Sequence, residues 1–570
     1  MIRKIALIGF CALLVTGCGR DEEETTAPAQ ADSSAGQADV SSALFTRIDA
    51  EPAFLIANLE PVPEDLSEEL WAPLQSMADF NSTTYNDLAE DLDESPVAAA
   101  LLREFAQIDS REAFAERGLH PNGHWAFHSV ALYPFAHWQL SDAEDFRAML
   151  DRVTADAGEE VSWRDIEDAQ VLWVAMEEGF GVAIAYDEQF ATVALIPDNA
   201  ALLRRVANLD QPARAYDASE LADFSNSRGF TPYGAGFIEF GRIVDQLLDG
   251  DEEMLAAARE SSPLGEIAGN AACRKELGAL VDLFPRTSLG YTEISDSSMV
   301  SMMTVETNAE FAERLQALVD TPVELGDTRG GVFDFGLAIN IVGARDFGRE
   351  LVAGWVENPP QCEMFKAIRE NAADWQMALN QPIPPVVTNF HGLRLSVDSI
   401  EMGEGSSVES AEATLAMFMR NPQMMLGMAQ MFSPELASLQ LEPGGEPQPV
   451  PAGVIPNLPA GIQAFIGLGE GGLGLAVGES QRDQLAGALE PGEGGNAMLT
   501  YGIDFAGYAQ AMEGLFSGMQ QQLEALGEEG TADPSQTMSA LAELYDYSHM
   551  GIYLSDRGIE LRSVMTLADQ

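Results

Sequence analysis

The sequence predicts an α+β protein in which antiparallel sheets carry covering helices in two or three internally duplicated units. Three observations indicate this class. Segments of alternating apolar and polar residues follow one another with short turns between them, helical segments lie between these groups, and one pattern of strand, helix, insert and hairpin recurs. Adjacent strands joined by short turns are typical of antiparallel pairing. With 570 residues, the chain can form several domains with cores of their own.

Residues 45–230 are expected to form an N-terminal α+β domain. An apolar strand at 53–59 opens it, closed by Pro61 and Pro63, and mainly helical residues follow at 64–116. Alternating patterns then predict strands at 125–133, 171–176, 181–186 and 191–196, with helices at 143–153 and 199–208.

The recurring pattern indicates internal duplication. A strand with one acid between apolar neighbours leads directly into a helix at 236–240, and the same arrangement returns at 501–505. Each copy continues through a helical insert to a hairpin that turns on a Ser-Asp pair, at 295–297 and at 555–558. A third, weaker copy covers 337–395. A one-residue slip would turn every side chain of a strand to the wrong face, so the two clearest copies, within 233–305 and 501–567, are expected to superpose.

The expected organisation follows from these patterns and from local composition. A stretch without aromatic residues or apolar periodicity is expected to be a disordered acidic tether, and a stretch rich in Pro and Gly is expected to be a linker. The expected segments are a signal peptide at 1–17, the tether at 18–44, the domain at 45–230, related units at 231–326, 327–442 and 459–570, and the linker at 443–458.

The first residues indicate export and lipid anchoring. Arg3 and Lys4 precede a short apolar run that ends in Val15-Thr16-Gly17-Cys18. This ending resembles the lipobox of bacterial lipoproteins. The resemblance implies acyl chains on Cys18 and cleavage before it, and Gly19 after the cysteine favours the outer membrane, with the body in the periplasm or at the cell surface. Two or more acyl chains make a stable anchor, so a membrane is the first expected partner.

The charge of the chain excludes one class of partner. Acids number 91 against 30 lysines and arginines, which gives a formal net charge of −61. Such a surface repels nucleic acid and anionic lipid headgroups, so nucleic-acid binding is not expected. The acids are spread along the whole chain. This favours adaptation to a salty medium, in which self-repulsion is screened, over a specific cation-binding surface.

Two cysteines remain after Cys18 in the expected mature chain. Cys273 and Cys362 each fall in the helical insert of a repeat, and a pair of cysteines in an exported protein is usually a disulfide. Closing a loop of this length would stabilise the fold by about 4 kcal/mol in the chain-entropy model. Two separate buried thiols are the alternative.

Four of the six histidines are close together in the sequence, at His120, His124, His128 and His137. Helical spacing would place the first three on one face, as metal ligands require, but residues 121–123 break a helix there. On a strand, His124 and His128 share a face about 13 Å apart, too far to hold one ion. A metal site would then need His137 or a neighbouring acid. The simpler interpretation is histidines on a half-buried strand, and no metal or cofactor is expected.

A methionine-rich segment is the second candidate site. Met417, Met424, Met425 and Met428 belong to a run that is interleaved with phenylalanine. Thioether clusters can select Cu(I), and flexible methionines can also line a hydrophobic groove. The simplest interpretation is a pair of helices broken at residues 421–422, with the methionines packed into a core.

No catalytic signature appears in the sequence: it contains no G-x-S-x-G elbow, no H-E-x-x-H motif and no P-loop. The glycine-rich run at 467–474 is expected to be a hairpin turn. The expected function is therefore non-enzymatic: a binding or scaffolding module of the envelope. The alternatives are a carrier of a hydrophobic molecule in a Met-lined pocket and a hydrolase without a recognisable motif. An envelope protein or a hydrophobic ligand would be the further partner.

Overall fold

The computed structural model describes residues 34–568, except for positions 65, 68–70, 72–77, 91–95, 159–160, 177–178, 251–266, 326–330, 403–407, 434, 452–453, 456–460, 512–538 and 540. The chain divides into two compact units, residues 1–303 and 304–570, here called unit 1 and unit 2. Each combines antiparallel sheet with helices, so the predicted α+β class is confirmed. Among the described helices, none is long and apolar enough to cross a membrane.

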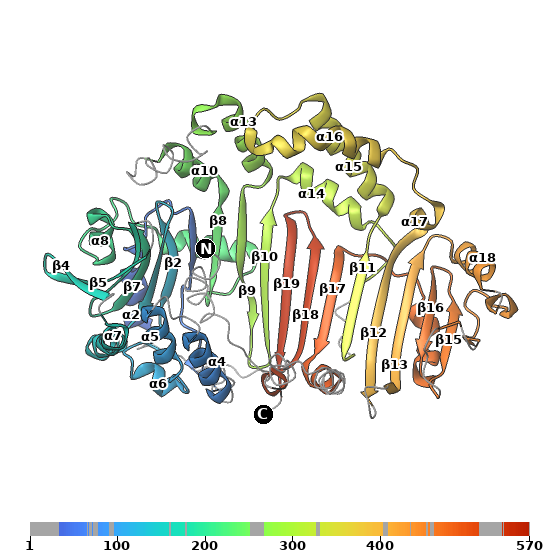
Figure 1. Cartoon of the computed structure of the whole chain (residues 1–570), viewed down its shortest axis with the longest axis horizontal. Helices are drawn as coiled ribbons and strands as arrows, with labels where there is room; N and C mark the ends of the chain where they lie inside the picture. The colour runs from blue at the N-terminus through green and yellow to red at the C-terminus, as the bar shows by residue number, and fades with distance from the viewer. Residues whose placement is uncertain are drawn as a thin grey trace, which may run out of the picture. The chain divides into compact units, whose positions relative to one another are not determined.

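Unit 1 is an antiparallel sheet with helices on both faces (Figure 1). Its strands pair in the order β9-β8-β1-β2-β3-β7-β6-β5-β4, and β10 pairs with β9. The strands are β1 (Phe54–Ala57), β2 (Trp125–Val130), β3 (Tyr133–Gln139), β4 (Val161–Ile166), β5 (Ala169–Ala175), β6 (Phe180–Tyr186), β7 (Phe190–Pro197), β8 (Ala235–Glu239), β9 (Arg286–Ile294) and β10 (Ser298–Glu306). The helices are α2 (Ser34–Phe45), α4 (Ala78–Glu90), α5 (Pro96–Phe105), α6 (Arg111–Ala115), α7 (Ala143–Ala157), α8 (Ala200–Val206), α9 (Ala218–Arg228), α10 (Phe240–Asp249) and α13 (Ala271–Leu283).

Alternation along the strands of unit 1 creates two cores. Leu172 of β5 and Ile184 of β6 face α5, α6 and α7, whereas the next residue, Trp173, packs with the side of the sheet that α8 covers. On that second side, α2 and α9 pack on β1 and β8 around Leu55 and Phe237. Successive side chains of a strand point to opposite faces, so β5, β6 and β7 each contribute to both cores.

Unit 2 has the sheet order β18-β17-β11-β12-β13-β16-β15-β14, and β19 pairs with β18 (Figure 1). The strands are β11 (Phe333–Ala338), β12 (Phe390–Met402), β13 (Val408–Met419), β14 (Gln448–Pro449), β15 (Ala464–Leu468), β16 (Gly472–Val477), β17 (Ala497–Asp504), β18 (Tyr545–Leu554) and β19 (Gly558–Leu567). The helices are α14 (Ala309–Gln316), α15 (Ile341–Glu357), α16 (Lys366–Leu379), α17 (Pro385–Asn389), α18 (Pro422–Phe432) and α19 (Glu479–Ala488), with the short 3-10 helix η4 (Ala317–Val319) after α14.

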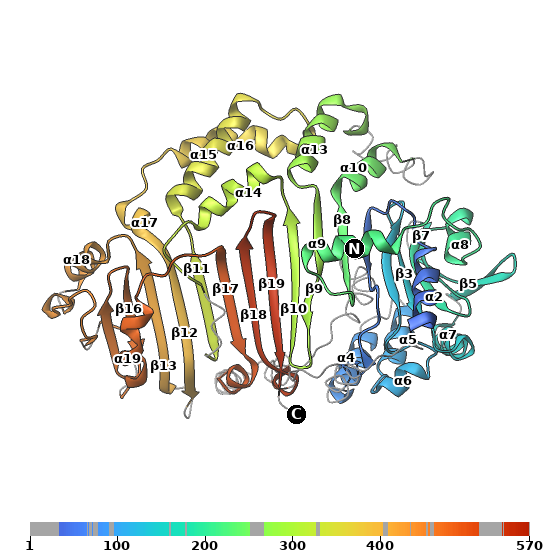
Figure 2. The same ribbon diagram turned by 180° about the vertical axis from the view of Figure 1, so that it is seen from behind.

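One face of the unit 2 sheet carries α19 (Figure 2). Leu485 and Leu489 pack from α19 and its end onto Ala416 and Phe418 of β13. On the other side, Leu315 of α14 and Val319 of η4 pack onto Leu554 at the end of β18, which lies on the same side of the strand as Ile552. Glycines on the α19 side of the sheet leave room for neighbouring side chains to pack closely. A Cβ added at Gly474 would meet Leu485 at 2.8 Å, and one added at Gly502 would meet the Tyr547 hydroxyl at 1.9 Å.

The two units share one strand order. In both units the order starts from the first strand of the last hairpin. It reads β9-β8-β1-β2-β3-β7-β6-β5 in unit 1 and β18-β17-β11-β12-β13-β16-β15-β14 in unit 2, and the strands correspond one to one in chain order. The expected hairpin turns both occur, with Ser295 N donating to Ser298 O and Ser555 N donating to Gly558 O. Descent from one duplicated unit, and the superposition of 233–305 on 501–567, stay predictions.

The structure differs from the expected segment boundaries at three places. Residues 34–44 of the expected disordered tether belong to α2, so the prediction of disorder is wrong there, because Val40, Ala43 and Leu44 form an apolar stripe that packs on β1. Residues 18–33, with Cys18, lie outside the described residues. The expected linker 443–458 contains β14, which pairs with β15, and strand β8 of the expected separate unit 231–326 pairs with β1 of the expected domain 45–230.

Candidate functional site

The expected histidine site consists of a buried pair without a third ligand among the described residues. His128 of β2 and His137 of β3 approach with their Nε2 atoms 3.0 Å apart, and both are fully buried. Thr192 Oγ1 lies 3.0 Å from His137 Nδ1, and the Ser129 carbonyl lies 3.3 Å from His128 Nδ1. His124 does not join them, and its ring nitrogens are buried without a hydrogen-bond partner among the described residues.

The partners of the pair decide which nitrogens carry protons. The Ser129 carbonyl only accepts, so His128 Nδ1 donates to it and His128 Nε2 accepts. His137 Nε2 is then the donor between the two rings, and Thr192 donates to His137 Nδ1. Every ring nitrogen is satisfied with both imidazoles neutral, so the pair is a polar network inside the core of unit 1.

Acid is expected to destabilise unit 1 through these histidines. Burial lowers the pKa of His128 to about 3 and the pKa of His137 well below its ordinary value. The unfolded chain takes up a proton near pH 6.5 and the folded chain does not, so the stability present above pH 6.5 is lost as the pH falls toward 3. His128 alone accounts for about 2 kcal/mol between pH 7.5 and 5. Urea unfolding at both pH values measures the loss, and an equal loss in the His128→Gln/His137→Gln variant would rule out these side chains as its source.

The expected methionine-rich site is split between a strand and a helix. Met417 and Met419 belong to β13, and α18 begins only at Pro422, so the prediction of a broken helix pair is wrong. Alternation decides the strand, because Leu415, Met417 and Met419 point to one face while Ala416 and Phe418 are buried under α19.

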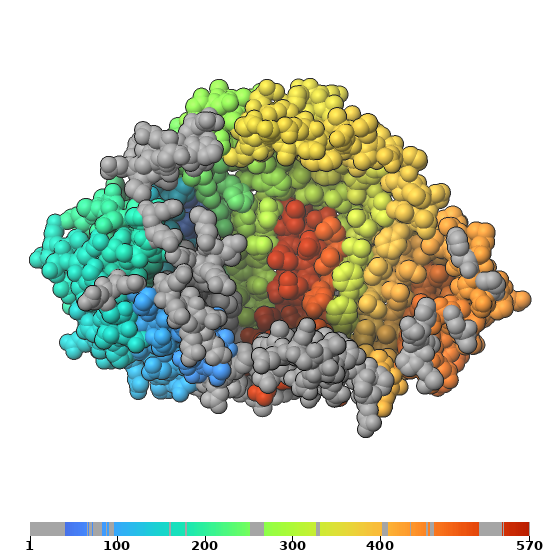
Figure 3. Space-filling model, viewed as in Figure 1, coloured from blue at the N-terminus to red at the C-terminus, as the bar shows by residue number. Residues whose placement is uncertain are grey.

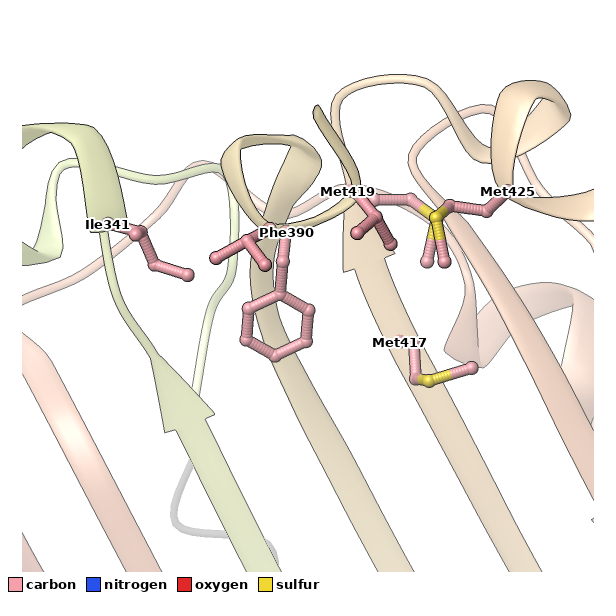
Figure 4. Close-up of a pocket in the computed structure, with 7 residues that line it drawn as sticks. Ile341, Phe390, Met417, Met419 and Met425 are labelled. Atoms are coloured by element: carbon pink, nitrogen blue, oxygen red, sulfur yellow. The ribbon is translucent and has the colours of Figure 1, made fainter. Parts of the chain in front are cut away.

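An apolar pocket of about 250 Å³ lies at the end of β12 and β13 (Figure 4). Here called the methionine pocket, it is lined by Ile341, Val386, Val387, Phe390, Met417, Met419 and Met425. Of the four methionines expected from the sequence, Met417 and Met425 line it. Met424 and Met428 are partly exposed on α18 and are not among the lining residues.

The sequence did not single out the other walls of the pocket. Val386 and Val387 belong to α17, which Pro384 and Pro385 begin, and Phe390 opens β12 opposite Met419. Ile341 begins α15 directly after β11. The proline-rich segment 382–387 carried a usable signal, since a run of prolines marks a turn, here directly before β12.

Met417 of the methionine pocket belongs to a row of apolar residues that crosses the unit 2 sheet. Met417 pairs with Leu393 of β12, Leu393 pairs with Leu337 of β11, Leu337 pairs with Leu499 of β17, and Leu499 pairs with Ile552 of β18. A second cross-strand row lies beside it. The open face is defined as Phe333, Phe335, Leu337, Leu393, Leu395, Val397, Leu499, Tyr501, Met550 and Ile552.

The open face reverses the usual arrangement of an antiparallel sheet. Its side chains are large and apolar, yet each is partly exposed, and Met550 is 41% exposed. The alternate positions, such as Gly336, Thr500 and Gly502, are buried on the opposite face. An antiparallel sheet with one solvated face normally turns polar residues to it. In Figure 3 the strands of unit 2 are visible on this side below α15 and α16.

Cross-strand contacts hold the open face in a fixed arrangement. The rings of Phe333 and Tyr501 meet edge to face with centroids 5.4 Å apart, and burial raises the pKa of the Tyr501 phenol. The corresponding strands of unit 1 present a smaller partly exposed set, in which Phe54 stacks on Phe127. An exposed contiguous apolar surface of this kind marks a place where a ligand or partner binds.

The expected disulfide is described in part. Cys273 and Cys362 are each disulfide-bonded, and both are buried, at 2% and 0% exposure. Their pairing with each other stays a prediction. The turn expected in the run 467–474 is present between β15 and β16, where Gly469 N donates to Gly472 O.

Comparisons with known proteins give no family for this chain. No family model matches it, and no curated protein matches it. A solved structure titled "Structure of crystal form III of TP0453" is similar over 50% of this chain and 88% of that chain, with 9% identity and a TM-score of 0.24. A likeness at this level carries no conclusion about fold or function.

Proposed function

We propose that this chain is a non-enzymatic, lipid-anchored envelope protein whose unit 2 binds a hydrophobic molecule with a long alkyl chain. The observation that carries the proposal is the open face together with the methionine pocket. Ligand sites are concave and mainly apolar, and methionine side chains adapt to flexible ligands. The pocket volume of about 250 Å³ is below the ~300–1,000 Å³ of sites that enclose a whole ligand. The remainder of the chain would therefore lie along the open face.

The expected anchor fits this role. Acyl chains on Cys18 would hold the body beside a membrane, which is a source of molecules with alkyl chains. The outer membrane is the proposed location. A scaffold that receives apolar side chains of an envelope protein on the same surface is the competing proposal.

Mass analysis of the purified chain tests the proposal. We expect native mass spectrometry to find a population heavier by one alkyl-chain molecule, which organic extraction releases and identifies. A Phe335→Asp variant purified in parallel should lack this population, because a carboxylate in the centre of the open face must be desolvated when a ligand covers it. A wild-type chain that carries no such molecule and takes none up from lipid vesicles would contradict the proposal and favour the scaffold.

A further inference from the structure

The two segments that form the methionine pocket contain no acid. Residues 375–397, with α17 and the start of β12, and residues 413–434, with the end of β13 and α18, hold no Asp or Glu. The whole chain has 91 acids in 570 residues, about one in six. The charges that these segments do carry are positive, at Arg394 and Arg420. The potential at the pocket is therefore less negative than over the rest of the surface.

Arg420 is the residue after Met419, which lines the pocket, and it carries a positive charge. Its backbone N donates to Asn389 O at 2.8 Å, which holds it next to Phe390. Its side chain is exposed and forms no ion pair with the described residues. Other arginines of unit 2 do find acids, since Arg349 pairs with Asp346 at 3.2 Å and Arg369 with Glu363 at 2.9 Å.

His391 is a second polar residue next to the pocket lining. It directly follows Phe390 at a bulge of β12, where Phe390 pairs with Met419 and Gly392 pairs with Phe418. Its Nδ1 atom is buried and has no hydrogen-bond partner among the described residues. Burial, and then the charge of Arg420, lower the pKa of the imidazole. A buried polar atom without a partner is costly, and a polar head group of a bound ligand would supply that partner.

We infer that the methionine pocket binds a single-chain anionic amphiphile, whose alkyl chain enters the pocket and whose anionic head lies against Arg420 and His391. This inference rests on the proposed function and names the chemical class of its ligand. A fatty acid and a monoacyl phospholipid share this chemistry, with a carboxylate or a phosphate at one end of one chain. The guanidinium suits either head, because it presents several N–H donors in a plane.

Arg394 provides a matched control. It lies in the same acid-free segment and also has no ion pair among the described residues. It pairs with Ala416 in the interior of the β12–β13 ladder and not at the end where the pocket lies. Four residues along β12 separate it from Phe390, a distance of about 13 Å. A head group at the pocket therefore depends on Arg420 and not on Arg394.

Calorimetric titration of the purified full chain with dodecanoate, dodecyl phosphate and dodecanol tests the inference. The wild type should bind the two anions roughly three- to tenfold more tightly than dodecanol, as expected for a partly exposed charge pair. Arg420→Gln should abolish this preference and leave dodecanol binding unchanged, whereas Arg394→Gln should retain it. The anion that binds more tightly identifies the source of the ligand as fatty acid or phospholipid.

Two results would contradict the inference in different ways. Equal affinity of the wild type for anions and dodecanol, or an undiminished preference in Arg420→Gln, would overturn the head-group assignment while the proposed function stands. No binding of any of the three probes would overturn both. Matching thermal unfolding midpoints would confirm that each variant is folded.

Discussion

Phe335→Asp is expected to abolish binding of a long-chain alkyl ligand and to leave unit 2 folded. Phe335 lies at the centre of the open face, between Leu395 of β12 and Tyr501 of β17. A bound alkyl chain would bury the new carboxylate without a partner. Because this costs several kcal/mol, we expect affinity to fall at least about 100-fold. The side chain is already partly exposed, so the free energy of unfolding should fall by only about 1 kcal/mol.

Two controls separate loss of the site from loss of the fold. Val356 is also apolar and 38% exposed, but it lies on α15, away from the open-face strands. Val356→Asp should therefore bind the alkyl probe as the wild type does. Leu172 is fully buried in unit 1, and Leu172→Asp should lose about 4 kcal/mol or more. Fluorescence titration and urea unfolding measure both quantities. Wild-type affinity in Phe335→Asp would show that the open face is not the site.

Glu104→Gln is expected to destabilise unit 1 by about 3–5 kcal/mol. Glu104 of α5 binds Arg152 of α7 at 2.5 Å and Arg117 at 3.3 Å, and its side chain is only 9% exposed. Arg117 is also 9% exposed, and burial lowers the pKa of its guanidinium while the charge of Glu104 raises it. Removing the carboxylate leaves Arg117 as an uncompensated buried charge.

An exposed ion pair and a double variant test this explanation. Glu64, 67% exposed, pairs with Arg111, and Glu64→Gln should change stability by less than about 1 kcal/mol. Glu104→Leu/Arg117→Leu should recover much of the stability lost in Glu104→Gln, since it removes both charges. Urea unfolding at neutral pH gives the free energies. A loss below about 1 kcal/mol in Glu104→Gln would mean that water solvates Arg117 in the folded chain.

The alternation of residues predicted the strands and the α+β class, because a period of two is a local property of the sequence. The expected strands at 181–186 and 191–196 correspond to β6 and β7, and the expected helix at 143–153 lies within α7. The helix at residues 34–44 was not predicted. Its short apolar stripe stands among polar residues, and it is stabilised by packing on β1, which local sequence does not show.

The candidate sites were predictable in composition and not in geometry. The methionine run did reach a pocket, but β13 and α18 divide it, and Val386 and Ile341 come from distant parts of the chain. His128 and His137 meet because β2 and β3 form a hairpin, which spacing along one strand does not reveal. The alternation in β11 was visible, but the sequence alone does not state which face the helices cover.

Photolabelling tests the central claim most directly. A fatty acid with a diazirine at the end of its alkyl chain is bound to the purified wild-type chain and irradiated, and the labelled residues are mapped by peptide mass spectrometry. We predict labels within β11, β12, β13 and β17 of unit 2, at residues of the open face and the methionine pocket, and their loss when excess dodecanoate is present. Labels confined to unit 1, or labels that excess dodecanoate does not reduce, would contradict the account.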